Sequence, residues 1–242
     1  MRNIKLTLEY DGTDFSGWQY QPGFRTIQHE IESSLKIIFN QETIVIGAGR
    51  TDAGVHALGQ VANFTIDSSL PLERIKAALN GTMSRDVRVK KVEEVPENFN
   101  SRYDAIRRHY RYTIIQNESA LKRHYAWCFK TALNIDDMQR ASDCLIGEHD
   151  FRAFCQAGAD VKHHRCVVEE ARWQRQDDVL TFDIKANRFL HNMVRIIVGT
   201  VVNIGRGHTH VEQISVILNS KDRIHAGPTV PAKGLCLVQV YY

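Results

Sequence analysis

Two periods of hydrophobic residues alternate along the first hundred positions of the chain. Apolar residues at every second position predict a strand over residues 4–10, and apolar residues at helical spacing predict a helix over 27–38. Thr26 is predicted to cap that helix, because its hydroxyl can accept a hydrogen bond from a free backbone N–H of the first turn. The same patterns predict further elements in this half, which are strands at 43–46, 61–66 and 87–95 and a helix whose first residue is Pro71.

The order of elements recurs from Arg107 onward. The predicted elements are strands at 107–114, 166–173, 180–186 and 235–241 and helices at 135–145, 189–204 and 211–218, with Gly147 ending the first of these helices. We therefore predict an α+β fold of two ferredoxin-like (RRM-like) halves that share a mixed, mainly antiparallel central sheet flanked by helices. Residues 97–106 show no clear periodicity, so the predicted halves are 1–104 and 105–242.

Composition narrows the class of protein. The 242 residues are 43% hydrophobic and 24% charged, which is ordinary for a folded chain, and the net charge of +3 means that any RNA contact must come from local clusters of basic residues. Five widely spaced cysteines without a C-x-x-C pair favour reduced thiols and a cytoplasmic location. The chain begins directly with strand alternation and contains no 18-residue apolar run, so we expect no signal peptide and no membrane span.

One acidic residue, Asp52, stands in a glycine-rich segment that follows a predicted strand. Residues 47–57 read Gly-Ala-Gly-Arg-Thr-Asp-Ala-Gly-Val-His-Ala. A dinucleotide-binding G-x-G-x-x-G motif is excluded, because Asp52 occupies the position of its third glycine. The glycines allow left-handed backbone or close approach to another segment, and they present the carboxylate for contact with a ligand. Taken alone, Asp52 is more often a residue that caps its own turn than a catalytic one.

Four further motifs accompany this segment in a fixed order, and they are Tyr10–Thr13, Phe15–Gln19, Arg188–Arg195 and Pro231–Leu235. Together the five motifs resemble the tRNA pseudouridine synthase A family from end to end. The chain departs from the family pattern at Val230 and Ser101, which affects local packing only. The resemblance implies a pseudouridine synthase fold and an isomerase that converts uridine to pseudouridine, with Asp52 as the catalytic carboxylate and no cofactor.

Arg195 falls within the predicted helix over 189–204, which is apolar nearly all round and is therefore expected to be buried. Helical spacing places Arg188 and His191 on the same stripe as Arg195. A buried guanidinium needs a carboxylate partner, and the candidates are Asp52, Asp11 and Asp183. The resemblance favours Asp52 and gives Arg195 the task of keeping that carboxylate ionised and oriented.

Tyr110 and Tyr112 alternate on a predicted strand, so both face one side while His109 and Arg111 face the other. Such a pair is more often a cross-strand contact in a core, although aromatic rings also stack on RNA bases. The resemblance assigns Tyr110 to the active site, where it stacks on the target base and handles a proton. We expect Tyr112 in the core.

Basic residues are the expected contacts to RNA phosphates, although most such residues are simply solvated. The candidates are Arg25, Arg50, Lys122, Arg123, Lys162, His163, His164, Arg165 and Arg188. Of these, Arg50 is expected to fill or clamp the gap left by a flipped nucleotide, and Arg25 and Arg188 are expected to contact the substrate. Cys155, His163, His164 and Cys166 match no zinc spacing, so we expect no metal.

By resemblance the substrate is the anticodon stem-loop of tRNA, at uridines 38, 39 and 40, and the protein is a homodimer. Two other classes remain open. A non-catalytic RNA-binding module of ferredoxin-like fold uses similar aromatic residues, but it has no need of an acid in a glycine loop. A glycoside hydrolase needs a second catalytic acid, and none lies in the matched motifs. The sequence leaves open whether Asp52 attacks C1′, attacks C6 or removes a sugar proton.

Overall fold

The computed structural model of the chain describes residues 1–158 and 163–242, and these form two compact units. The first unit comprises residues 1–106 and 236–242, and the second comprises residues 107–235. The last strand therefore groups with the first unit, whereas the sequence interpretation had placed it in the second half.

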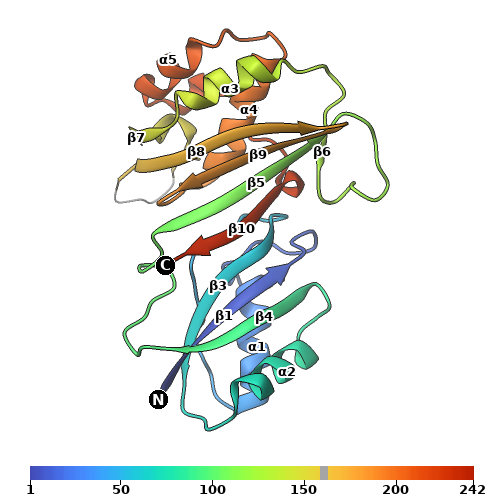
Figure 1. Cartoon of the computed structure of the whole chain (residues 1–242). Helices are drawn as coiled ribbons and strands as arrows, with labels where there is room; N and C mark the ends of the chain where they lie inside the picture. The colour runs from blue at the N-terminus through green and yellow to red at the C-terminus, as the bar shows by residue number, and fades with distance from the viewer. Residues whose placement is uncertain (159–162) are drawn as a thin grey trace. The chain divides into compact units, whose positions relative to one another are not determined.

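The first unit has the strand order of a ferredoxin-like fold (Figure 1). Its elements are β1 (Arg2–Tyr10), α1 (Ile27–Phe39), β2 (Ile46–Gly47), β3 (His56–Ile66), α2 (Leu72–Thr82), β4 (Val87–Val95) and β10 (Leu235–Tyr241). Strand β1 lies between β4 and β3 and is antiparallel to both, the short β2 is antiparallel to β3, and β10 is parallel to β3. Alternating residues of β1 are fully buried, as its sequence predicts.

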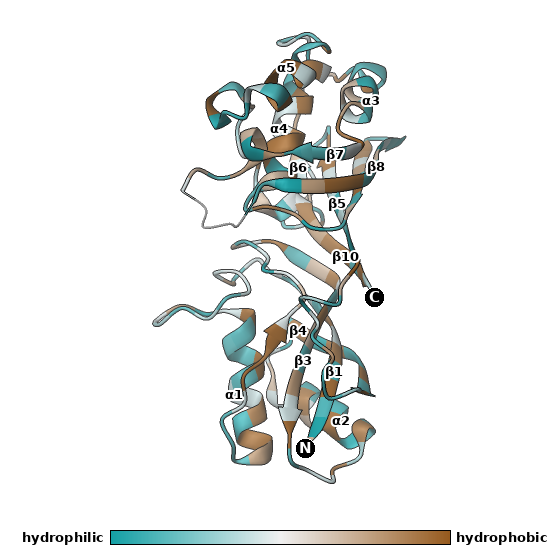
Figure 2. Cartoon of the chain, turned by 90° about the vertical axis from the view of Figure 1, so that its left-hand side faces the viewer, coloured by the Kyte–Doolittle hydropathy of each residue, from teal (hydrophilic) through white to brown (hydrophobic). Residues whose placement is uncertain are grey.

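Helix α1 shows how the sequence specifies this unit. Thr26 has an extended backbone and its side chain accepts a hydrogen bond from the His29 N–H, which confirms the predicted cap. One side of the helix buries Ile27, Ile31 and Leu35, and the mixture of brown and teal along α1 in Figure 2 shows this amphipathic character.

The second unit contains β5 (Arg107–Ile115), β6 (Trp127–Cys128), α3 (Ile135–Asp143), β7 (Gly147–Asp150), β8 (Arg165–Gln176), β9 (Val179–Ala186), α4 (Met193–Gly205) and α5 (Gln213–Ser220). Its described residues also form the short 3₁₀ helices η1 (Arg152–Phe154), η2 (Arg223–His225) and η3 (Ala232–Gly234). Its strands follow the order β5-β9-β8-β7 with antiparallel neighbours, and β6 is parallel to β5. Helices α3, α4 and α5 lie on one side of these strands (Figure 1).

Aromatic side chains fill the core between this sheet and its helices. Trp173 and Phe182 stack with ring centroids 4.7 Å apart, and Trp173 Nε1 donates to Ser142 Oγ on α3 at 3.0 Å. Tyr112 is fully buried and donates its hydroxyl proton to the Pro231 carbonyl oxygen at 2.8 Å, and burial raises the pKa of this phenol. The predicted core position of Tyr112 and the predicted α+β class with mainly antiparallel strands are confirmed.

Some predicted boundaries were wrong. The segment 43–46 is not a buried strand, because only Ile46 pairs and Ile44 is 78% exposed. Pro71 is the cap of α2 rather than its first residue. Helix α3 ends at Asp143, and Gly147 instead begins β7 with a left-handed φ of 108°, so the buried Leu145 lies beyond the helix.

No helix among the residues that the structure describes is long and apolar enough to cross a membrane.

Candidate active site

Asp52 lies half-buried in the loop between β2 and β3, and backbone hydrogen bonds hold this loop to an earlier segment of the chain. Trp18 N donates to the Thr51 carbonyl at 3.0 Å, and Gly54 N donates to the Phe15 carbonyl at 3.2 Å. Within the loop, Val55 N donates to the Asp52 carbonyl at 3.2 Å. The residues on both sides of Asp52 are therefore fixed by the Phe15–Gln19 motif.

Two glycines of the earlier motifs allow this close approach. A Cβ on Gly12 would lie 2.1 Å from the Val55 carbonyl oxygen, and a Cβ on Gly17 would lie 2.7 Å from the Thr51 carbonyl oxygen. Gly17 also has a left-handed φ of 91°. Any side chain at either position would displace the loop that carries Asp52. The motifs around Gly12 and Gly17 are thus part of the support of this loop.

A buried polar network supports the loop from the core side. The hydroxyl groups of Tyr10 and Thr51 share a hydrogen bond of 2.8 Å. Gln60 Nε2 lies 3.4 Å from the Tyr10 hydroxyl and donates to the Gly49 carbonyl at 2.9 Å. Burial raises the pKa of Tyr10, so this phenol stays protonated and acts through hydrogen bonds. The network joins β1 and β3 to the residue that precedes Asp52.

Asp11 has its own place in this unit. Its Oδ1 accepts from Thr13 N at 3.0 Å, which caps the turn at Gly12, and it lies 3.2 Å from His56 Nδ1. Trp18 is 2% exposed and therefore belongs to the core.

Tyr110 lies on β5 of the second unit and is 7% exposed. Its ring meets Phe189 edge-on, with centroids 5.1 Å apart and an interplanar angle of 84°. Phe189 belongs to the Arg188–Arg195 motif, so that motif supports the tyrosine through an aromatic contact.

The opposite face of β5 carries an ionic cluster in which His109 and Asp183 are buried and Arg111 is exposed. Asp183 Oδ1 accepts from His109 Nε2 at 2.6 Å and from Arg111 Nε at 3.0 Å. Burial pushes the pKa of Asp183 upward, but these hydrogen bonds outweigh it and leave the pKa below its ordinary value. The predicted division of faces between the tyrosines and this pair is confirmed. His109 and Arg111 are the partners recorded for Asp183, which had been one alternative partner for Arg195.

Arg195 lies in the first turn of α4 and is half-buried, not fully buried as predicted. Its Nε donates to the Val230 carbonyl at 2.8 Å, and its Nη1 donates to Asn192 Oδ1 at 2.7 Å. The predicted stripe of Arg188, His191 and Arg195 was wrong, because α4 begins only at Met193. Asn192 has a φ of 61°, and this left-handed residue prevents the helix from extending backward.

The predicted RNA contacts differ in their surroundings. Arg50 is exposed. Arg25 donates to Asp86 Oδ2 at 2.8 Å, and its guanidinium lies 4.0 Å from the centroid of the Phe15 ring. Arg188 is half-buried and donates to His163 Nε2 at 3.2 Å. Lys162 lies outside the described residues. Arg25 is therefore held by an acidic partner, whereas the described contact of Arg188 is to a ring nitrogen.

Asp52, Arg50 and Arg25 belong to the first unit, and Tyr110, Arg188 and Arg195 belong to the second. Sequence reasoning missed the supporting residues Tyr10, Thr51, Gln60 and Asn192. Tyr10, Thr51 and Asn192 stand inside the motifs, but only the folded chain shows what they contact.

The spacing of Cys155, His163, His164 and Cys166 led us to expect no metal. Among the residues that the structure describes, no three or more His, Cys, Asp or Glu side chains come together as a metal site. Cys155 and Cys166 are buried, and burial raises the pKa of both thiols, to about 12 for Cys166.

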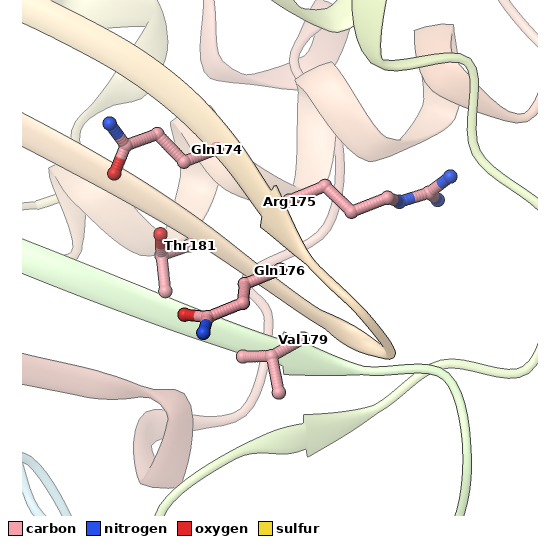
Figure 3. A pocket seen from close by; sticks show the side chains of 5 residues that line it. All are labelled: Gln174, Arg175, Gln176, Val179 and Thr181. Carbon is pink, nitrogen blue, oxygen red and sulfur yellow. The ribbon is translucent and has the colours of Figure 1, made fainter.

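A hollow of about 510 Å³ lies at the β8–β9 hairpin and is lined by Gln174, Arg175, Gln176, Val179 and Thr181. Figure 3 shows that these side chains come from the two strands near their connecting turn. The lining contains no carboxylate and none of the predicted site residues, so this hollow is not the candidate active site.

Comparison with known proteins adds independent information. A family model described as tRNA pseudouridine synthase matches residues 7–104 and 141–242. The chain belongs to the tRNA pseudouridine synthase family. Proteins named tRNA pseudouridine synthase A are 43% identical to it in Acetivibrio thermocellus and 44% identical in Caldicellulosiruptor bescii, in both cases over 100% of each chain. One from Geobacter sp. (strain M21) is 43% identical over 100% of this chain and 99% of its own.

A solved structure titled "Crystal Structure of a Cbf5-Nop10-Gar1 Complex" has a TM-score of 0.36 and 11% identity over 83% of this chain and 54% of its own, which is too distant to carry an argument. The predicted family is thus confirmed by sequence. All five motifs lie wholly within the ranges that match the family model.

Proposed function

We propose that this protein isomerises uridine to pseudouridine in the anticodon stem-loop of tRNA, at the neighbouring uridines 38 to 40, and that Asp52 is the catalytic carboxylate. The observation that carries the proposal is the fixed, half-buried Asp52 loop in a member of the tRNA pseudouridine synthase family. Glycines, backbone hydrogen bonds and a buried hydroxyl pair all act to hold this one acid in place.

The reaction breaks the N1–C1′ bond of uridine, turns the freed base and joins it to the sugar through C5. Reactant and product share one formula, so the chemistry requires no oxidant, reductant or energy source. It does require an ionised carboxylate beside the sugar and base, a surface that retains the detached uracil, and removal of the nucleotide from its stack. Asp52 supplies the carboxylate in this proposal.

We assign roles to Arg195, Tyr110 and Arg50 from the chemistry of their side chains. The Arg195 guanidinium is always charged, so opposite Asp52 it favours the ionised carboxylate and orients it. Tyr110, whose ring is braced by Phe189, offers a flat surface for the uracil ring and a hydroxyl that handles a proton. Arg50 is exposed and able to enter the gap left by a flipped nucleotide.

Further basic residues serve the RNA backbone. Arg188 bears a charge that its recorded partner, the His163 ring nitrogen, does not compensate, so it is suited to a phosphate. Arg25 contributes less in this proposal, because Asp86 already binds its guanidinium. Homodimer formation doubles the phosphate contacts available to a chain with a net charge of only +3. We place the protein in the cytoplasm, where tRNA is processed and thiols stay reduced.

The test uses the purified protein and an unmodified tRNA transcript. Pseudouridine is mapped by a chemical adduct that stops reverse transcription, and a transcript with cytidine at the three anticodon-arm positions serves as the substrate control. The proposal is supported if adducts form at those three positions in the unmodified transcript and not in the cytidine control. tRNA binding without any adduct would instead favour the non-catalytic RNA-binding module.

Two variants assign the carboxylate. Asp52→Asn should abolish adduct formation while tRNA affinity stays within a few-fold, since most binding energy comes from phosphate contacts. The matched control is Asp14→Asn, which changes an exposed acid of the same unit and should leave turnover unchanged. An active Asp52→Asn variant would reject the assignment of this residue.

A further inference from the structure

Within the second unit, uncharged oxygen atoms hold the Arg195 guanidinium, and the proposed function does not by itself require them to be uncharged. Two acceptors hold its guanidinium within this unit, the Val230 carbonyl oxygen and Asn192 Oδ1, and each of them is neutral. An arginine has five N–H donors, and neutral acceptors fix the plane and direction of the group without cancelling its charge. A carboxylate in either position would fix it equally well but would compensate the charge.

The Val230 contact is fixed by the backbone. Val230 N lies 3.4 Å from the Arg195 carbonyl, which makes the contact between these two residues reciprocal. The segment that carries Val230 is seated on α4, because Gly227 N donates to Thr200 Oγ1 at 2.8 Å and the Pro228 carbonyl lies close against Gly199. No side-chain substitution at Val230 can remove this acceptor.

The second acceptor is the side-chain amide of Asn192. Its orientation is set by Arg195 at the amide oxygen and by Gln156 at the amide nitrogen. The guanidinium can only donate, so the amide atom facing it must be the oxygen. The Asn192 amide nitrogen then points to Gln156 Oε1 at 3.2 Å, where it finds an acceptor. The left-handed backbone of Asn192, with φ 61° and ψ 5°, turns its side chain back toward the first turn of α4.

We propose that Asn192 is a positioning residue, which holds the Arg195 guanidinium in its working orientation and leaves its charge for the catalytic carboxylate. This inference rests on the proposed function, in which Arg195 acts on Asp52. Asparagine suits the position for two reasons: it tolerates left-handed backbone, and it supplies an uncharged acceptor.

Three variants separate these properties. Asn192→Gly removes the amide but keeps the left-handed backbone, which glycine adopts without strain. Asn192→Asp keeps an acceptor of the same shape and adds a negative charge beside Arg195. The control is Asn40→Gly, the same change at an exposed left-handed asparagine that caps α1 in the first unit, with φ 50°.

We measure the single-turnover rate of pseudouridine formation at saturating enzyme, the tRNA dissociation constant and the midpoint of urea unfolding. Asn192→Gly should lower the rate by about 10- to 100-fold, because a misplaced catalytic group costs roughly that much. Its tRNA affinity should match that of wild type, and its unfolding midpoint should match that of Asn40→Gly. Asn192→Asp should be slowed at least as much although its hydrogen bond survives.

The outcomes distinguish this inference from the proposed function. A wild-type rate in Asn192→Gly, or full activity in Asn192→Asp, overturns the inference if wild type is active and Asp52→Asn is not. A rate loss in Asn192→Gly that is matched by a lower unfolding midpoint or weaker tRNA binding also overturns it, because the role is then structural. An inactive wild type would instead reject the proposed function.

Discussion

The Tyr10 and Thr51 hydroxyl groups lie 2.8 Å apart in the core of the first unit, and Thr51 is the residue immediately before Asp52. The two residues are 2% and 6% exposed, so water cannot readily replace either partner. This single hydrogen bond joins strand β1 to the loop that carries the proposed catalytic carboxylate.

Tyr10→Phe and Thr51→Val should each lower the free energy of unfolding by about 1–2 kcal/mol, because each leaves one buried hydroxyl without its partner. The double variant should lose less than the sum of the two, since it leaves neither hydroxyl stranded. Urea unfolding of all four proteins measures this coupling. Strictly additive losses would show that the hydrogen bond does not stabilise the loop.

Two helical glycines provide a matched test of packing. A Cβ on Gly199 of α4 would lie 1.9 Å from the Pro228 carbonyl oxygen, whereas a Cβ on Gly81 of α2 meets nothing within 4 Å. Gly199→Ala should therefore cost about 1–3 kcal/mol of stability through overpacking. Gly81→Ala should instead gain about 0.5–1 kcal/mol. Thermal unfolding of both variants gives the two signs, and equal effects would contradict the close contact at Gly199.

Tyr110 and Tyr112 lie on the same strand and on the same side of the sheet. We expect Tyr110 to act in the reaction and Tyr112 to stabilise the core. Tyr110→Phe keeps the ring against Phe189 and removes only the hydroxyl, so any fall in turnover measures its part in proton handling. Tyr110→Ala should also weaken binding of the target nucleotide, by about 1–3 kcal/mol.

Tyr112→Phe is the control for the Tyr110 variants. It breaks the hydrogen bond to Pro231 and should reduce stability, measured by urea unfolding, with little change in turnover. A Tyr110→Ala variant with wild-type kinetics would place Tyr110 in the core alone.

The cluster around Asp183 should contribute to stability in a pH-dependent way. The folded pKa of Asp183 lies below its ordinary value of 3.8, so its ionised form stabilises the fold. This contribution is fully present above pH 3.8 and is lost as pH falls through the lower folded pKa. Asp183→Asn should thus be less stable than wild type near pH 6, and the difference should narrow below pH 3.8. Asp14→Asn, at an exposed site, should track wild type throughout, and a constant difference for Asp183→Asn would refute this role.

The proposed pairing of Asp52 with Arg195 can be tested by stability alone. Asp52→Asn and Arg195→Met each strand one member of a pair, and the combined variant strands neither. The double variant should therefore be more stable than the sum of the single changes predicts. Urea unfolding of the four proteins measures the coupling. A coupling energy of zero would mean that Arg195 finds its partner elsewhere.

The sequence predicted the elements whose residues alternate between buried and exposed. Strands β1 and β5 and helix α1 follow local periodicity, and Thr26 caps its helix by a contact only three residues away. Periodicity failed at the start of α4. Phe189 and Leu190 continue its apolar pattern toward the N-terminus, but the left-handed Asn192 makes the helix begin only after them, at Met193. It also failed at 43–46, where Thr43 and Val45 are buried but Ile44 is exposed and only Ile46 pairs as a strand residue.

The sequence predicted those residues of the candidate site that stand in recognisable motifs. Asp52, Tyr110 and Arg195 came from residue type and resemblance, but their supports depend on contacts between distant parts of the chain. Tyr10 meets Thr51 across 41 positions, and Val230 meets Arg195 across 35. No local pattern encodes such pairs, so they emerge only from the folded units.

The placement of β10 has a consequence for synthesis of the protein on the ribosome. Residues 236–242 complete the first unit beside β3, yet they are translated after the whole second unit. The short β2 already covers part of this edge of β3, and the part that β10 covers stays open while the ribosome adds the second unit. Pairing across such a long sequence separation slows folding, and it leaves part of an edge open to aggregation until residues 236–242 are added.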